Sequence, residues 1–168
     1  MAKTSYAIAL GSNRRHGTHG APAAVVRAAV DATAQLGKVE ALSTIRSTPA
    51  LGPAGRSFAN AALILRSRLD PTELLAELKA LERAFGRRPG RRWGPRVLDL
   101  DIILWSDGPW ESAGLVVPHP AFRERGFVLD PLAEIAAGWR DPVTGATVRQ
   151  LRARLRAPRA VDRARDRP

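Results

Sequence analysis

Two carboxylates spaced two residues apart, directly after a run of arginines, are the side chains in this chain best suited to chemistry. Asp99 and Asp101 lie within residues 97–105, a stretch rich in Val, Ile, Leu and Trp that predicts a β-strand. Because side chains alternate across a strand, both carboxylates point to the same side, with Cα atoms about 7 Å apart. The alternation predicts one face formed by Leu98, Leu100, Ile102 and Leu104, and the other formed by Val97, Asp99, Asp101, Ile103 and Trp105.

The charge pattern around this pair indicates a magnesium–polyphosphate site. Two carboxylates held close together repel each other unless cations compensate them. Oxygen ligands suit Mg²⁺, which is usually held by one or two carboxylates plus substrate phosphates. Arginines supply forked donors for phosphate oxygens, and residues 87–96 contain five of them. A bare Asp-x-Asp is more often found on the solvated face of an ordinary strand, and the adjoining arginines reduce that preference without settling it, so the other motifs must decide.

Length and composition predict one compact domain. The chain has 168 residues, of which 45% are hydrophobic, so it can bury a core. No apolar run is long enough to span a membrane, and no signal peptide precedes the first apolar stretch. Cysteine is absent, which excludes disulfides and thiolate metal sites. We therefore expect a cytoplasmic protein that binds no membrane.

The formal net charge of +11 comes from two blocks of arginine. Residues 82–97 contain six Arg and one Glu, and residues 149–168 contain eight Arg and two Asp. The first block adjoins the two carboxylates. The second extends into residues 157–168, which we predict to be a disordered tail after a single domain over residues 1–156. A basic chain also permits a second hypothesis, an RNA-binding module.

The elements that must position the carboxylates follow from apolar periodicity and turn residues. Strands are predicted over residues 5–10, 38–47, 58–68 and 97–105. Helices are predicted from Pro22 to residue 36 and from Asp70 to residue 85, where Asp70 is the N-cap, Pro71 is at N1 and Glu73 is at N3. This order predicts an α+β fold with a ferredoxin-like βαββαβ core, an antiparallel sheet with helices on one face, and C-terminal additions that include a helix over residues 147–156.

Several short motifs occur in order along the chain. They are Ala-Leu-Gly-Ser-Asn at 9–13, Ser-Thr-Pro-x-Leu-Gly-Pro at 47–53, Phe-Ala-Asn at 58–60, Glu82 with Gly86-Arg87, Arg-Trp-Gly-Pro-Arg-Val-Leu-Asp-Leu-Asp at 92–101, Val-Pro-His-Pro at 117–120 and Arg-Gly-Phe-Val-Leu-Asp-Pro-Leu at 125–132. Together they resemble the 6-hydroxymethyl-7,8-dihydropterin pyrophosphokinase family. The resemblance covers roughly residues 5–136, and the run at 92–101 is its most specific part.

The resemblance implies that pyrophosphate is transferred from ATP to the 6-hydroxymethyl group of the dihydropterin, a step of folate biosynthesis that releases AMP. It implies that Asp99 and Asp101 hold two Mg²⁺ ions and that Arg87 and Arg96 join them in catalysis. The implied ATP contacts are Glu82, Arg88, Arg92, Trp93, Arg96, Ile102, His119 and Arg125. The implied pterin contacts are Thr48, Pro49, Leu51, Phe58, Asn60 and Phe127. We expect a monomer whose partners are these two small molecules, with no specific nucleic acid.

Two departures and two alternatives accompany this assignment. Gly114 and Val116 stand where relatives carry Arg and Thr, and the 87–92 loop is about one residue shorter than in relatives, which affects ATP binding more than chemistry.

Phe58 and Phe127 can also be read as ordinary core residues. One alternative function is a non-catalytic relative that binds pterin and nucleotide. The other is the RNA-binding module, which needs paired exposed aromatics on central strands.

Overall fold

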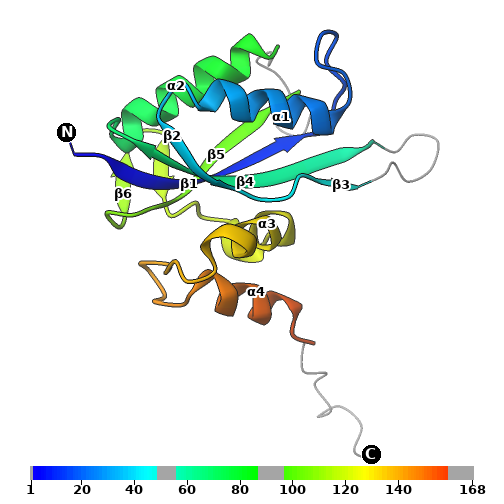
Figure 1. Ribbon diagram of the computed structural model, residues 1–168. Coiled ribbons are helices and arrows are strands. Elements are labelled where there is room, and N and C mark those ends of the chain that lie inside the picture. Colours follow the sequence, from blue (N-terminus) through cyan, green and yellow to red (C-terminus); the bar gives the residue numbers. More distant parts are fainter. Residues whose placement is uncertain (1, 49–55, 87–96, 159–168) are drawn as a thin grey trace, which may run out of the picture.

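A five-stranded sheet, with helices on both faces, organises the molecule (Figure 1). The structure is a computed structural model that describes residues 2–48, 56–86 and 97–158. Helices α1 (Pro22–Thr33) and α2 (Pro71–Ala84) lie against one face, and α3 (Gly126–Ala136) and α4 (Val148–Arg156) lie on the other. The α+β, ferredoxin-like prediction is confirmed. The C-terminal additions cover the face that the predicted core leaves open.

The strands are antiparallel and run in the order β2-β4-β1-β5, with β3 also paired to β4. Their bounds are Thr4–Ser12 for β1, Lys38–Leu42 for β2, Arg46–Thr48 for β3, Phe58–Ser67 for β4 and Asp99–Trp105 for β5. The single strand predicted over residues 38–47 is therefore two short strands on the same neighbour. Strand β5, which carries the carboxylates, is at one edge of the sheet.

Helix α2 begins where its capping signal predicts. Asp70 Oδ1 accepts from the Glu73 N–H at 2.8 Å, and Glu73 Oε2 accepts from the Asp70 N–H at 2.9 Å, so the two side chains satisfy each other's backbone. Leu74, Leu78 and Phe85 are buried on one side of the helix, as their spacing predicts. The cap and the apolar stripe together set how α2 lies across the sheet.

Strict alternation divides most of the core between the two faces. Tyr6, Ile8 and Leu10 of β1 pack with α1 and α2, whereas Ala7 and Ala9 pack with α3 and α4. The alternation predicted for residues 97–105 is wrong at its end. The register slips between Ala7 and Ile8, so Ile103 is an extra residue in β5.

Because of the extra residue, the side chains at the end of β5 lie on the opposite faces of the sheet from those predicted. Leu104 packs on the α3 side, although alternation predicts it on the α1 and α2 side. Trp105 packs on the α1 and α2 side, although alternation predicts it beside the carboxylates. Val97, which precedes the strand, also packs with the α1 and α2 core. Asp99 and Asp101 keep their shared side because both precede the bulge.

The chain after β5 differs most from prediction. A hairpin of β6 (Trp110–Ser112) and β7 (Leu115–Val117) follows, then a 3₁₀ turn over Phe122–Glu124. Residues 126–136 form helix α3, which is not among the helices predicted from the sequence. The helix predicted over 147–156 is confirmed as α4, with a capping box at Thr147.

Ion pairs fasten the C-terminal helices. Asp130 of α3 bonds Arg152 and Arg156 of α4, both at 2.8 Å. The fully buried carboxylate of Asp141 bonds Arg123, whose guanidinium lowers the pKa of that carboxyl to about 2. No helix among the described residues is long and apolar enough to cross a membrane. The single domain and the disordered tail stay predictions, since residues 159–168 lie outside the described residues.

Candidate functional site

The two carboxylates lie on the side of the sheet that α3 partly covers. Asp99 pairs with Gly11, and Asp101 pairs with Ala9, a residue of the cluster formed by α3 and α4. Burial raises the pKa of Asp101, and the neighbouring Asp99 carboxylate raises it further, while His119 and Lys79 act in the opposite direction. The predicted common side is confirmed. Two carboxylates placed so close together in a half-buried setting favour a bound cation.

Asn60 belongs to the same row of the sheet as Asp99. Gly11 of β1 pairs with Asn60 of β4 on one side and with Asp99 of β5 on the other. Residues paired directly across antiparallel strands share a face, so Asn60 and Asp99 lie on the same side, with Cα atoms about 10 Å apart. A Cβ at Gly11 would lie 3.2 Å from the Asn60 Oδ1. The glycine therefore leaves room for the Asn60 amide above β1.

Two half-exposed phenylalanines border this row. Phe58 has the parity of Asn60 along β4 and is 45% exposed, and it pairs with the exposed Thr48 of β3. Phe127, at the start of α3, is 55% exposed. Their exposure rules out the reading of both as ordinary core residues. Large apolar side chains left this open at a polar row offer flat surfaces for an aromatic ligand.

His119 is brought to the carboxylates by the bulge in β5. The extra residue, Ile103, turns its carbonyl off the sheet edge, where it accepts from the His119 N–H at 3.0 Å. The imidazole Nδ1 accepts from the Ala121 N–H at 3.2 Å, so Nε2 is the nitrogen that donates in the neutral ring. Burial lowers the pKa of His119, and Asp101 acts in the opposite direction. The alternation of side chains in the sequence does not predict that His119 lies near Asp101.

Arg125 adds a cation at the same place. Its guanidinium carbon lies 5.7 Å from the centre of the Phe127 ring, and its charge lowers the pKa of His119. Arg125 is also the residue that precedes α3. The start of α3 therefore presents an aromatic ring and a cation beside a strand that presents two carboxylates.

An ion pair holds β3 against α3 next to this row. Glu134 of α3 accepts from the Arg46 guanidinium and, at 2.8 Å, from the Thr44 N–H. These bonds lower the pKa of Glu134, the backbone bond from Thr44 most. Since Arg46 pairs with Asn60 in the sheet, Glu134 ties the strand beside Asn60 to the helix that carries Phe127.

Two residues of α2 meet the other side of β5. Glu82, predicted as a nucleotide contact, is fully buried and accepts from the Leu100 N–H at 2.9 Å. Lys79, which the sequence reading missed, donates to both Glu82 oxygens, at 3.1 and 3.3 Å. Ile102, also predicted on the nucleotide side, is 2% exposed and packs in the α1 and α2 core. An acidic residue three positions after a lysine on a helix was the available signal for the pair.

The remaining predicted residues fall outside the described part of the chain. They are Pro49 and Leu51 of the pterin set and Arg87, Arg88, Arg92, Trp93 and Arg96 of the ATP and catalytic sets. The described residues place Asp99, Asp101, Asn60 and Phe58 on one side of the sheet. His119 lies close enough to Asp101 to act on its pKa, Arg125 acts on His119 in turn, and Phe127 lies next to Arg125.

The carboxylate pair fits Mg²⁺. Within residues 2–48, 56–86 and 97–158, no group of three or more His, Cys, Asp or Glu side chains could hold a metal ion. Asp99 and Asp101 supply two hard oxygen donors on one strand face, and burial together with their mutual repulsion raises the pKa of Asp101. Mg²⁺ commonly takes one or two carboxylates and completes its coordination with water and substrate phosphates. A two-carboxylate set is therefore sufficient for this ion when a polyphosphate shares it.

Several curated proteins that are similar in sequence to this chain are named pyrophosphokinases. The family described as 7,8-dihydro-6-hydroxymethylpterin-pyrophosphokinase matches residues 7–137. A Synechocystis protein named 2-amino-4-hydroxy-6-hydroxymethyldihydropteridine pyrophosphokinase is 46% identical over 114 residues, which are 68% of this chain and 58% of that protein. A Pseudomonas aeruginosa protein of the same name is 39% identical over 138 residues, covering 80% of this chain and 82% of its own.

Solved structures agree on the fold. The crystal structure of Plasmodium falciparum HPPK-DHPS with SDX-DHP superposes with a TM-score of 0.67 at 12% identity, over 90% of this chain and 44% of that one. At that identity the likeness concerns the fold alone, whereas the family match rests on the sequence of most of the chain. This chain spans little more than half of the Synechocystis protein and less than half of the Plasmodium chain. By its sequence match over residues 7–137, the chain belongs to the 7,8-dihydro-6-hydroxymethylpterin-pyrophosphokinase family.

Proposed function

We propose that this protein transfers pyrophosphate from ATP to the 6-hydroxymethyl group of 6-hydroxymethyl-7,8-dihydropterin. One observation carries the proposal beyond family membership. The row Asn60–Gly11–Asp99 puts an amide suited to a heterocycle edge about 10 Å from a carboxylate suited to a metal–phosphate complex, on one side of one sheet. That spacing is of the size needed to seat a pterin next to a triphosphate.

The pterin side of the site consists of aromatic and amide groups. In the proposal, Phe58 and Phe127 stack on the two faces of the ring, which explains why both stay half exposed. The Asn60 amide both donates to and accepts from the ring edge. Thr48, Pro49 and Leu51 complete the pterin set by their place in the family motif.

The phosphate side consists of carboxylates and cations. Asp99 and Asp101 would hold two Mg²⁺ ions, which when bound neutralise triphosphate charge. His119 and Arg125 would donate to phosphate oxygens from the start of α3 and the turn before it. Arg87, Arg88, Arg92, Trp93 and Arg96 are assigned to ATP or catalysis by the family motif alone.

The reaction is a single displacement at phosphorus. The 6-hydroxymethyl oxygen of the pterin forms a bond to the β-phosphorus of ATP, and the bond from that phosphorus to the oxygen bridging to the α-phosphate breaks. The hydroxyl proton is lost to solvent, and AMP leaves with the bridging oxygen. The protein's share is to align the two oxygens and to stabilise charge, since little covalent work is required of it.

A turnover assay with ATP, Mg²⁺ and 6-hydroxymethyl-7,8-dihydropterin tests the proposal if it separates AMP from ADP. We expect AMP and the pterin diphosphate in equal amounts. ADP would mean single phosphoryl transfer and would overturn the reaction type. Binding of both substrates without any nucleotide product would leave the non-catalytic alternative, and salt-sensitive RNA binding without ATP binding would leave the RNA-binding one.

The metal ligands are tested by mutation. Asp101→Ala should abolish turnover while the protein stays folded, because the two Mg²⁺ ions lose one of the two carboxylates proposed to hold them. Asp107→Ala is a matched control, since Asp107 is exposed in the turn after β5 and should leave turnover unchanged. Near-normal turnover in Asp101→Ala would refute the metal assignment.

A further inference from the structure

Glu82 is a buried carboxylate that contacts the strand between the two aspartates. Its side chain is fully buried, and it accepts from the Leu100 N–H at 2.9 Å. Leu100 is the residue between Asp99 and Asp101, so this bond is made at the centre of the Asp-Leu-Asp motif. Glu82 lies near the C-terminal end of α2, on the face of the sheet opposite to the aspartate side chains.

The bond matters because β5 is an edge strand. Its described strand partner is β1, and the Leu100 N–H that bonds Glu82 points away from β1. A buried N–H at a sheet edge is destabilising when it has no acceptor, so the Glu82 carboxylate stabilises this edge of β5. Further along the same edge, the Ile103 carbonyl accepts from the His119 N–H. Two hydrogen bonds therefore hold the edge of β5 that faces away from β1, one on each side of Asp101.

Lys79 makes the buried charge tolerable. A carboxylate removed from water is costly unless it is paired and hydrogen-bonded. The Lys79 ammonium lies one turn earlier on α2 and reaches both Glu82 oxygens, at 3.1 and 3.3 Å. The Lys79 side chain is 36% exposed, so the lysine links the buried carboxylate to the surface of α2.

We propose that Glu82, held by Lys79, is a positioning residue. It fixes the β5 backbone so that the Asp99 and Asp101 carboxylates keep a constant position relative to each other. Glu82 acts through Leu100 and does not contact the nucleotide, in contrast to the role that the family resemblance implies. The expected effect of Glu82 on turnover rests on the proposed function, because Glu82 acts on turnover only by positioning Asp99 and Asp101. The hydrogen bond that anchors Leu100 does not depend on the proposed function.

The first test is amide hydrogen exchange at Leu100, measured by NMR. Glu82→Leu has similar bulk and no acceptor, so exchange at Leu100 should speed up about tenfold or more relative to wild type, as expected when a hydrogen bond to a charged group is lost. Glu82→Gln keeps one acceptor oxygen and should restore most of the protection. Exchange at Ile8 and Leu63, in the centre of the sheet, should change in neither variant.

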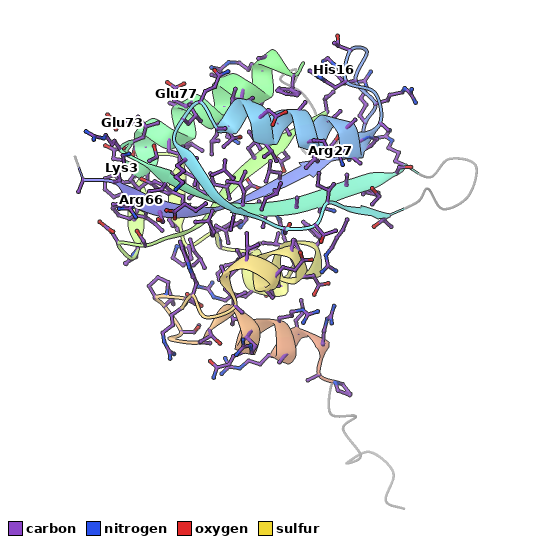
Figure 2. All side chains as sticks on the ribbon, in the orientation of Figure 1. Lys3, His16, Arg27, Arg66, Glu73 and Glu77 are labelled. Carbon is purple, nitrogen blue, oxygen red and sulfur yellow. The ribbon has the colours of Figure 1, made fainter. Side chains whose placement is uncertain are left out.

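Glu77 supplies matched controls, because it lies on the same helix and is exposed on the outer side of α2 (Figure 2). Glu77→Leu and Glu77→Gln make the same chemical changes without a contact to β5, and neither should alter Leu100. Unchanged exchange at Leu100 in Glu82→Leu would overturn the proposal. If Glu82→Leu does not fold, the NMR chemical shift of the Leu100 amide in Glu82→Gln replaces it as the test. This shift should change more than that of any other β5 amide. An unchanged shift would overturn the proposed anchoring.

The second test asks whether the anchoring reaches the aspartates. Calorimetric binding of Mg²⁺ with a non-hydrolysable ATP analogue should weaken in Glu82→Leu and recover in Glu82→Gln. The kcat should follow the same order, while KM for the pterin stays near wild type. If Glu82→Gln binds as poorly as Glu82→Leu although Leu100 stays protected, the Glu82 charge contacts the nucleotide directly and the proposal fails. An inactive wild type would refute the proposed function but leave the exchange result to decide the anchoring.

Discussion

Replacing Gly11 by alanine should damage pterin use while leaving the fold at least as stable. Gly11 lies in β1 between Asn60 and Asp99, and its φ is not in the left-handed region. Alanine can therefore adopt the same backbone. The added Cβ would lie 3.2 Å from the Asn60 Oδ1, so the amide has to turn aside by a few tenths of an ångström.

The size of the effect follows from the contacts at stake. A neutral hydrogen bond contributes about 1 kcal/mol net, and an amide that both donates and accepts makes two of them. Misplacing the Asn60 amide should therefore raise KM for the pterin between about fivefold and thirtyfold. Stability should move the other way, because a glycine replaced in a compatible backbone gains about 0.4–1 kcal/mol from the unfolded state.

Steady-state kinetics with each substrate varied in turn, together with urea unfolding, measure both effects. KM for ATP should change little, since the added methyl group contacts Asn60 and not the carboxylates. Gly138→Ala is the matched control, because its Cβ would meet no atom within 4 Å. An unchanged KM for the pterin in Gly11→Ala, or an equal rise for both substrates, would refute the placement of the pterin beside Asn60.

Three further changes have defined outcomes. Phe127→Ala should weaken pterin binding about tenfold and ATP binding less, measured by calorimetry, because it removes one stacking surface; equal losses would argue against stacking. Asp141→Asn should lower the free energy of unfolding by about 3 kcal/mol or more in urea titrations, since it leaves Arg123 without its buried partner. In the wild type the Asp141 pKa is depressed to about 2, so this group stabilises the fold above about pH 4 and its contribution, about 2 kcal/mol, is lost as pH falls from about 4 to about 2. Asp141→Asn should flatten that part of the stability–pH curve, and an unchanged curve would count against the ion pair. Tyr6, whose pKa burial raises to about 12, should make the fold less stable as pH rises from about 10 to about 12, and Tyr6→Phe should remove that dependence.

Local sequence determined the elements that depend on near neighbours alone. The Asp70–Glu73 capping box and the leucine spacing after it were sufficient to predict α2, because caps and apolar stripes act within a few residues. The strand that carries Asp99 and Asp101, and their common side, followed from period-two alternation. Helix α3 was not predicted as a helix, because Pro131 lies inside it and proline disfavours a helix locally. The helix forms because its packing on the sheet outweighs that local cost.

Tertiary structure decided which of these residues meet. The pairing of Gly11 with both Asn60 and Asp99 depends on strand register, which joins residues far apart in the chain. The bulge at Ile103, which brings His119 to Asp101 and turns Trp105 over, depends on how β5 fits β1. The bond from Leu100 to Glu82 exists because β5 is an edge strand, and a strand becomes an edge only when the whole sheet is assembled. The sequence therefore specifies the residue types that carry out the chemistry, whereas the assembled sheet sets the distances between them.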